Sequence, residues 1–488
     1  MSEAPARCDL MFRGAAVFDG SGAEPVTADV AVENGRIAAI GDLGGSSAVV
    51  EIDAAGKALA PGFIDVHTHD DRYLLAQPDV PAKASQGVTT VVVGNCGISV
   101  APLTRPGLPP PPFDLLADRP EYCFESVDDY FRRLDEQPAA LNSLTLIGHS
   151  VLRYNCMDDL DRPATDAETG AMRDLMADAM DAGAIGMSSG LFYPPARAAR
   201  TEEVMGAAEA LTAGDGIYTA HIRNEADGIV DSIEEAAAIG RHADVQVVIS
   251  HHKCVGTANH GRTRETLPLL DRLAGAQRIG LDVYPYVAGS TVLLPEMVEM
   301  AEKTLVTWSK ARPDYAGRDL AEVAAEMGLS PLEAAAKLQP AGAVYFTMDE
   351  ADVRRIIAYP RSMIGSDGLP SDSHPHPRLW GTFPRVLGHY ARELGVLTMA
   401  DAVHRMTGLP ATEFGLGDRG FVRPGYHAVL VLFDPGSVLD RSTFEAPTRP
   451  AAGIALVLVN GEAVWRDGAS TGARPGRAIR RQETARGR

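Results

Sequence analysis

The stretch "PGFIDVHTHDD" at residues 61–71 joins a short apolar run to a group of histidines and aspartates. The apolar part has the composition of a buried strand, and His67 and His69 lie two residues apart near its end. Side chains two residues apart in a strand point the same way, so both imidazoles can reach one ion. The stretch therefore predicts a first strand with metal-binding chemistry at its carboxyl end.

Seven further apolar runs of this kind follow along the chain. They are "TTVVVGN" (89–95), "SLTLIGH" (143–149), "AIGMSSG" (184–190), "GIYTAH" (216–221), "VQVVISH" (245–251), "IGLDVYPY" (279–286) and "SMIGSDG" (362–368). Amphipathic segments such as 165–183 and 228–243 separate them. Eight apolar runs, mostly followed by helical segments, favour an α/β fold with a (β/α)8 TIM-type barrel over 61–415 rather than an open sheet.

The segments that flank the barrel have a different sequence pattern. Residues 1–60 and 416–480 contain short, valine-rich, alternating runs broken by glycine turns, which predicts one small β-sandwich domain formed by both termini. The interval between the last two barrel runs is too long for a loop and predicts an inserted subdomain at about 286–350, near the barrel mouth. The basic, polar residues 481–488 predict a loose tail. A proline-rich stretch at 103–114 is most simply an extended spacer.

Composition excludes several classes of partner. The chain has 488 residues and a net charge of −20, which disfavours nucleic acid and anionic membranes. It contains no apolar stretch long enough to span a membrane and no basic-then-apolar signal pattern. The five scattered cysteines do not indicate a disulfide framework. We therefore expect a cytoplasmic protein that acts on a small molecule; its oligomeric state is not predicted.

Metal-binding residue types recur at the ends of the apolar runs, where the catalytic groups of such a barrel gather. These residues are His67, His69, Cys96, His149, His221, His251 and Asp367. A thiolate together with imidazoles favours zinc over magnesium or calcium. The run ending in His251 and His252 favours His251, because that residue continues the strand directly. A carboxylate such as Asp367 can serve as a ligand and as a proton carrier.

Several motifs together resemble the N-acyl-D-amino-acid deacylases, or D-aminoacylases, of the amidohydrolase superfamily. The motifs are "PGFIDVHTHDD", "QGVTTVVVGNCGIS", "YTAHIRNE", "SHHK", "DVYPY", "GSDG" and "HPRLWGTFPRVL". The resemblance runs from about residue 8 to about residue 475. It implies zinc-dependent hydrolysis of a linear amide to a carboxylate and a free D-amino acid.

The same resemblance implies roles for individual residues. A tightly held zinc would lie on Cys96, His221 and His251. A second, weaker metal position would use His67, His69 and Asp367, with Cys96 bridging the two, and Asp367 would be the general base. The substrate carboxylate would be held by Lys253, Tyr284, Ser290 and Arg378, and Tyr193 would lie against the scissile carbonyl.

Two alternatives stay open at this point. A cyclic-amide hydrolase of the hydantoinase or dihydroorotase type would bridge two metals with a carboxylated lysine near the fourth strand, but no lysine lies between Lys83 and Lys253. A non-catalytic scaffold would be expected to lose metal ligands, and all six candidates are present. Within the N-acyl-D-amino-acid deacylase interpretation, the segment 289–303 lacks an arginine and contains Glu296, which predicts a preference for neutral D-residues.

Overall fold

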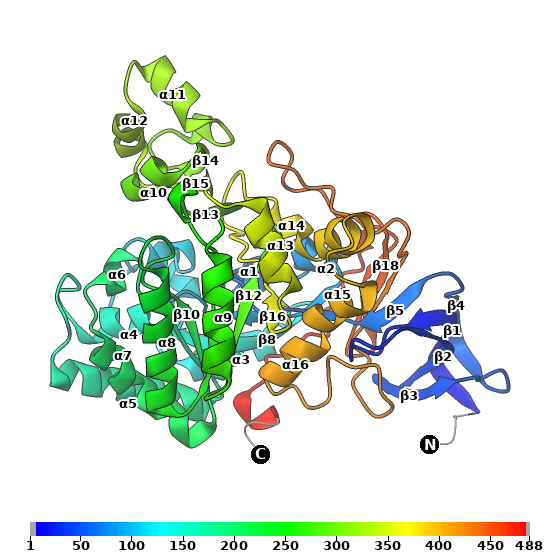
Figure 1. Cartoon of the computed structure of the whole chain (residues 1–488). Coiled ribbons are helices and arrows are strands. Elements are labelled where there is room, and N and C mark those ends of the chain that lie inside the picture. Colours follow the sequence, from blue (N-terminus) through cyan, green and yellow to red (C-terminus); the bar gives the residue numbers. More distant parts are fainter. Residues whose placement is uncertain (1–5, 485–488) are drawn as a thin grey trace.

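The computed structural model describes residues 6–484, and Figure 1 shows three connected parts: a barrel, a sheet beside it, and a projecting insertion. The barrel strands are parallel in the order β16-β12-β11-β10-β9-β8-β7-β6. Their bounds are β6 (Phe63–Asp65), β7 (Val88–Val93), β8 (Asn142–Gly148), β9 (Gly186–Gly190), β10 (Ile217–His221), β11 (Gln246–Ile249), β12 (Ile279–Val283) and β16 (Ser362–Ile364). A parallel bridge between Thr68 and Gly368 joins the first and last strands, which confirms the predicted barrel.

Helices cover the outside of the barrel (Figure 1). They are α1 (Tyr73–Ala76), α2 (Pro81–Ala84), α3 (Val127–Glu136), α4 (His149–Cys156), α5 (Asp166–Ala182), α6 (Pro194–Arg197), α7 (Thr201–Ala208), α8 (Ile229–Ala243), α9 (Thr263–Ala274), α13 (Glu350–Ala358), α14 (Arg378–Arg385), the π-helix Val386–Glu393, α15 (Met399–Met406) and α16 (Gly408–Glu413). Helix α5 begins at a capping box of Thr165 and Glu168 and ends at Gly183 with φ of 119°, a backbone conformation suited to glycine.

Strands from both ends of the chain form one nine-stranded sheet, where the sequence predicted a small β-sandwich domain formed by both termini. Its order is β20-β19-β18-β17-β5-β1-β2-β3, and β4 pairs with β1. The bounds are β1 (Arg7–Val17), β2 (Val26–Glu33), β3 (Arg36–Gly41), β4 (Ser47–Asp53), β5 (Ala58–Pro61), β17 (Leu430–Phe433), β18 (Ile454–Val459), β19 (Glu462–Arg466) and β20 (Ala469–Ser470). Leu10, Phe12, Leu59, Leu430 and Leu456 share its main apolar core.

The chain after this sheet returns to the barrel. Ala478 forms a parallel bridge with Ser143 of β8, and the backbone N–H of Arg481 donates to the carbonyl of Gly183 at 2.8 Å. The prediction of a loose tail differs from this finding over 481–484, because the short helix Arg481–Glu483 is tied to the barrel by backbone hydrogen bonds. Residues 485–488 lie outside the described residues.

The long interval between β12 and α13 forms a small unit of its own. It contains a three-stranded sheet in the order β13-β15-β14. Its elements are β13 (Ala288–Val292), α10 (Pro295–Met300), β14 (Lys303–Ser309), α11 (Leu320–Met327), α12 (Pro331–Leu338) and β15 (Ala341–Phe346). Leu293, Val306, Leu320 and Tyr345 contribute to a core separate from that of the barrel. We call this unit the insertion; it projects above the barrel at the top of Figure 1.

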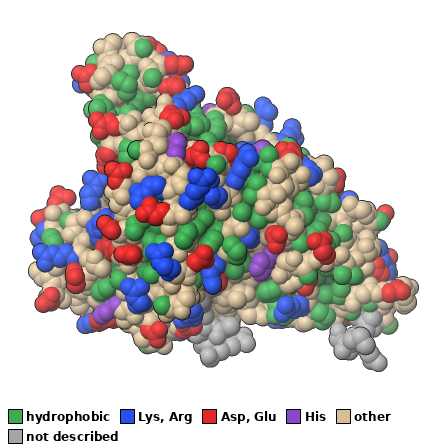
Figure 2. Space-filling view, in the orientation of Figure 1, with side chains coloured by type: hydrophobic (Ala, Val, Ile, Leu, Met, Phe, Trp, Pro, Cys, Tyr) green, Lys and Arg blue, Asp and Glu red, His purple; other side chains and the backbone are tan. Residues whose placement is uncertain are grey.

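Charged side chains of both signs are spread over the surface. In Figure 2, acidic and basic side chains of the described residues are interspersed on the visible face, without a single broad basic patch. Among residues 6–484, no helix combines the length and the apolar character needed to cross a membrane.

Candidate metal centre

Three candidate ligands lie just beyond barrel strands in an unusual backbone conformation. Cys96, His251 and Asp367 follow β7, β11 and β16, and their φ angles are 53°, 35° and 49°. Residues other than glycine rarely adopt a positive φ, and this kind of backbone strain is concentrated at functional sites. Gly97 permits the turn after Cys96, because a Cβ there would lie 2.7 Å from the backbone nitrogen of Gly190.

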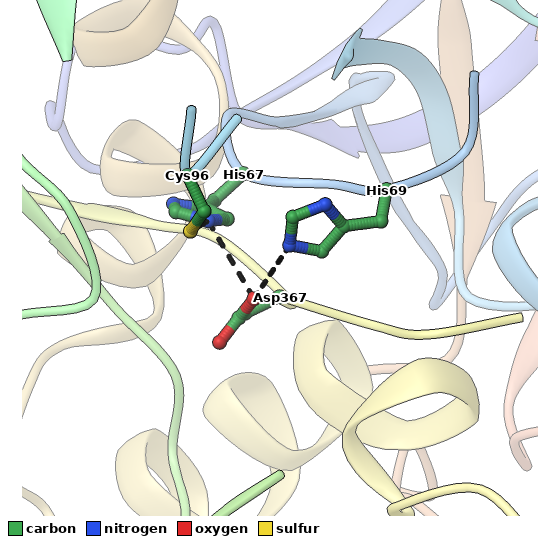
Figure 3. Close-up of side chains that lie close together, drawn as sticks. All are labelled: His67, His69, Cys96 and Asp367. Atoms are coloured by element: carbon green, nitrogen blue, oxygen red, sulfur yellow. Dashed lines mark hydrogen bonds and ion pairs between the residues drawn. The ribbon is translucent and has the colours of Figure 1, made fainter. Parts of the chain in front are cut away.

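Four buried side chains form a first group at the barrel mouth. His67, His69, Cys96 and Asp367 each offer a ligand atom, and these atoms lie within 4.8 Å of one another (Figure 3). His69 Nε2 lies 3.2 Å from Asp367 Oδ1 and His67 Nε2 lies 3.5 Å from the same oxygen. The spacing of His67 and His69 along the chain therefore does bring both rings to one carboxylate.

A second group shares Cys96 with the first. Cys96, His221 and His251 also offer ligand atoms within 4.8 Å of one another. His251 Nε2 lies 3.4 Å from the Cys96 sulfur. Apart from its approach to that sulfur, the buried His221 ring has no hydrogen-bond partner among the described residues. His252 instead contacts the Thr266 hydroxyl at 2.8 Å, so the structure places His251 rather than His252 in the cluster.

The electrostatics of the cluster favour charged Cys96 and Asp367. Burial opposes ionisation of the Cys96 thiol, but the rings of His67 and His251 outweigh it and hold the pKa of Cys96 well below its usual range. Burial likewise opposes ionisation of Asp367, and the Arg378 guanidinium and His67 overcome it, so the pKa of Asp367 also lies well below its ordinary value. A thiolate and a carboxylate are the forms that bind metal.

The residues predicted to hold substrate surround these two groups. Arg378 Nη1 lies 2.9 Å from Asp367 Oδ2, and its guanidinium stacks 4.6 Å above the Tyr284 ring. Lys253 Nζ donates to Glu225 at 2.6 Å. The Tyr193 ring centroid lies 4.8 Å from that of His221.

Two carboxylates that the sequence analysis did not single out orient the cluster. Asp282 accepts a hydrogen bond from the His251 backbone at 2.8 Å and lies 3.3 Å from His67 Nδ1. Glu225 Oε1 lies 3.1 Å from His251 Nδ1. Partners of this kind fix the orientation of histidine ligands. Asp282 lies in the motif "DVYPY" and Glu225 in "YTAHIRNE". The sequence does not show which histidine ring either carboxylate will contact.

A buried lysine holds the seam where the barrel closes. Lys83 Nζ donates to Asp65 at 2.8 Å and to Ser366 at 2.5 Å, and lies 3.4 Å from Asp70. The backbone N–H of Ser366 donates to Asp65 at 2.8 Å. Lys83 therefore ties β6 to the residue that precedes Asp367.

Replacing Lys83 with methionine is expected to destabilise the protein. It leaves Asp65 and Asp70 buried without their cation, which costs roughly 3–5 kcal/mol. Urea unfolding measures the change, and Lys337→Met on the exposed face of α12 is the matched control, expected to stay within about 0.5 kcal/mol of the wild type. Equal stability of the two variants would contradict the structural role of Lys83.

The chain is similar to known proteins along most of its length. A family model described as "Amidohydrolase family" matches residues 50–465. The chain is also 54% identical over 473 residues to a D-aminoacylase of Alcaligenes xylosoxydans xylosoxydans, which covers 97% of this chain and 98% of that protein. The chain belongs to the D-aminoacylase branch of the amidohydrolase family. The resemblance drawn from its motifs is thereby confirmed.

Two more relatives show the range of this branch. An N-acyl-D-aspartate deacylase of the same organism is 52% identical over 481 residues, covering 98% of this amidohydrolase and 96% of the relative. The solved structure of an N-acyl-D-glutamate deacylase from Bordetella bronchiseptica, complexed with zinc and a phosphonate inhibitor, superposes with a TM-score of 0.94 at 46% identity. That match covers 97% of this chain and all of the other.

Proposed function

We propose that this amidohydrolase is a zinc-dependent N-acyl-D-amino-acid deacylase, which hydrolyses the amide to a carboxylate and a free D-amino acid. The observation that carries the proposal is the Cys96 sulfur, which is common to two groups of buried donors at the barrel mouth. The zinc-bound glutamate deacylase and the D-aminoacylase relative support the same chemistry.

The donor atoms fit zinc. Cys96, His221 and His251 would hold the tight ion, since a thiolate with two imidazoles is a typical zinc set. His67, His69 and Asp367 would hold the weaker ion, because Arg378 already compensates part of the charge of Asp367. Zinc, when bound, acts as a Lewis acid toward water and the amide carbonyl.

Asp367 moves the proton in this proposal. Its depressed pKa keeps the carboxylate ionised at neutral pH, so it can orient the attacking water and accept its proton. The water oxygen bonds to the amide carbonyl carbon, and Asp367 then passes the proton to the nitrogen as the C–N bond breaks. Tyr193 would lie against the scissile carbonyl from the wall formed by β13, where its hydroxyl contacts Thr291 at 2.9 Å.

Unpaired buried donors mark the place for the substrate carboxylate. Arg378 Nε, the Tyr284 hydroxyl and the Ser290 hydroxyl are buried without a hydrogen-bond partner among residues 6–484. Leaving such groups unpaired is unfavourable, and a carboxylate can accept from all three. Lys253 adds positive charge nearby, 5.7 Å from the Tyr284 ring.

The side chain of the D-amino acid would occupy a cavity of about 480 Å³. Its apolar lining includes Phe192, Val255, Met297 and Met300. The segment 289–303 contains no arginine, but Arg197 and Arg223 line the cavity from other parts of the chain. Both are already compensated: Arg197 pairs with Glu296 at 2.8 Å, and Arg223 pairs with Glu235 at 2.7 Å. This compensation supports a preference for neutral, apolar side chains.

A panel of N-acetyl amino acids tests this assignment. We expect kcat/KM for N-acetyl-D-methionine and N-acetyl-D-leucine to exceed that for N-acetyl-D-glutamate and N-acetyl-D-aspartate by about tenfold or more. The L enantiomers should not be hydrolysed. Faster turnover of the acidic D-substrates would show that Arg197 or Arg223 leaves its partner to bind a second carboxylate, and would contradict the preference.

A further inference from the structure

We propose that this enzyme accepts medium-chain N-acyl groups, such as octanoyl, in an apolar groove between the proline-rich stretch and the insertion. The proposal rests on the deacylase function and names the acyl half of its substrate. We call this feature the acyl groove.

The acyl groove is a cavity of about 210 Å³. Its wall is mainly apolar, with members that include Pro111, Pro112, Pro194, Leu293, Leu294 and Trp308. Among the described residues that line it, Asp114 alone is charged, and Lys310 compensates that charge at 2.7 Å. A wall of this kind suits a hydrocarbon chain rather than an ionised group.

The acyl groove borders the reaction centre. A smaller cavity lined by His69, Cys96 and Asp367 shares Pro112, Leu115, Tyr193 and Val292 with the groove. We infer that a chain attached to the scissile carbonyl runs from the metal cluster into the groove past these shared residues.

The charges decide which half of the amide enters the groove. Lys253 and Arg378, which are predicted to hold the substrate carboxylate, line neither the groove nor the cavity of about 480 Å³. Lys253 nevertheless lies beside that cavity, because its Nζ donates at 2.6 Å to Glu225, which lines it. Phe192 and Tyr193 both pack near the metal cluster, with ring centroids 5.7 Å and 4.8 Å from that of His221. Phe192 lines the large cavity and Tyr193 lines the groove. The amino-acid half therefore takes the side with the charged residues, and the acyl half takes the groove.

This placement gives the proline-rich stretch a role beyond that of a spacer. Pro111 and Pro112 line the groove together with Leu293 and Leu294 of the insertion. The Lys310–Asp114 ion pair joins the two segments at the same place. Proline restricts the backbone, so this wall is ordered at a lower entropic cost when a chain binds.

The wild-type enzyme gives the first test. We compare kcat/KM for N-acetyl-, N-butanoyl- and N-octanoyl-D-methionine. Burying methylenes in an apolar groove should raise kcat/KM along the series by about tenfold or more overall. A flat or falling series would overturn the proposal. Loss of all turnover, including that of the acetyl substrate, would instead refute the deacylase function itself.

Two matched substitutions, one at each end of α10, test whether the effect of acyl-chain length on kcat/KM arises in the acyl groove. Leu294 lines the acyl groove, Met300 lines the large cavity, and both are partly buried. Leu294→Trp should lower kcat/KM for the octanoyl substrate by about tenfold and leave the acetyl substrate within roughly threefold. Met300→Trp should leave the octanoyl-to-acetyl ratio unchanged. An equal loss on both substrates in Leu294→Trp, or the same change of ratio in both variants, would overturn the proposal.

Binding gives a readout that does not depend on turnover. Calorimetry of N-octanoyl-D-methionine with zinc-loaded Asp367→Asn protein, with and without Leu294→Trp, compares affinity alone. We expect the second substitution to weaken binding by about tenfold. Unchanged affinity would place the acyl chain elsewhere.

Discussion

Asp367→Asn is expected to lower kcat/KM for N-acetyl-D-methionine by roughly 10²–10⁴-fold, the range that a positioned general base contributes. The amide keeps the size of the carboxylate but cannot take a proton from water at neutral pH. It also leaves Arg378, now 2.9 Å from Asp367, without its counter-charge. Steady-state kinetics at saturating zinc measure kcat/KM of the variant and of the wild type.

Metal analysis separates lost proton transfer from lost metal in this variant. Cys96, His221 and His251 are untouched, so the tightly held zinc should remain in Asp367→Asn. A variant with its tight zinc and undiminished kcat/KM would show that another group accepts the proton. Lys83→Met provides a second comparison with Asp367→Asn. It removes the contacts of Lys83 with Asp65 and Ser366 but keeps the carboxylate of Asp367.

Cys96→Ala is expected to have the other large effect, because it removes the donor that both groups share. Even partners that only orient a metal ligand change metal affinity or activity by about 10–100-fold, so loss of the ligand itself should exceed roughly 100-fold. The zinc content per chain, measured by plasma mass spectrometry after dialysis, should fall together with kcat/KM.

Cys8→Ala is the matched control for that substitution. Cys8 is also a buried free cysteine, but it lies in β1 of the terminal sheet, outside both donor groups. The Cys8→Ala variant should keep the zinc content and the kcat/KM of the wild type. Zinc content that is unchanged in Cys96→Ala would contradict the ligand assignment.

Much of the barrel could be predicted because its strands are buried on both faces. Strands such as β7 and β11 therefore appear in the sequence as continuous apolar runs, and residues at their ends meet at one mouth. The two-residue spacing of His67 and His69 likewise predicts two side chains that point the same way. These are local patterns, and local patterns are visible in a sequence.

The features that escaped prediction depend on neighbours far apart in the chain. The contacts of Asp282 with His67 and His251 arise only when β6, β11 and β12 are assembled. Glu225 and Lys83 are similar cases, since a charged residue in a sequence does not show that it will be buried with a partner. Arg197 enters the large cavity from α6, outside the segment where the sequence analysis sought an arginine.

The same reasoning explains the tail. Residues 481–484 are polar and basic, which is typical of a solvated end, but their backbone groups pair with the barrel near Gly183. Composition describes side chains and does not show where backbone donors find acceptors.

The most direct test of the account is the hydrolysis of N-acetyl-D-methionine and its L enantiomer by metal-free protein titrated with zinc. The account predicts no turnover without metal, recovery as the first zinc binds, and hydrolysis of the D enantiomer alone. Full activity in the metal-free protein, or equal rates on the two enantiomers, would contradict it.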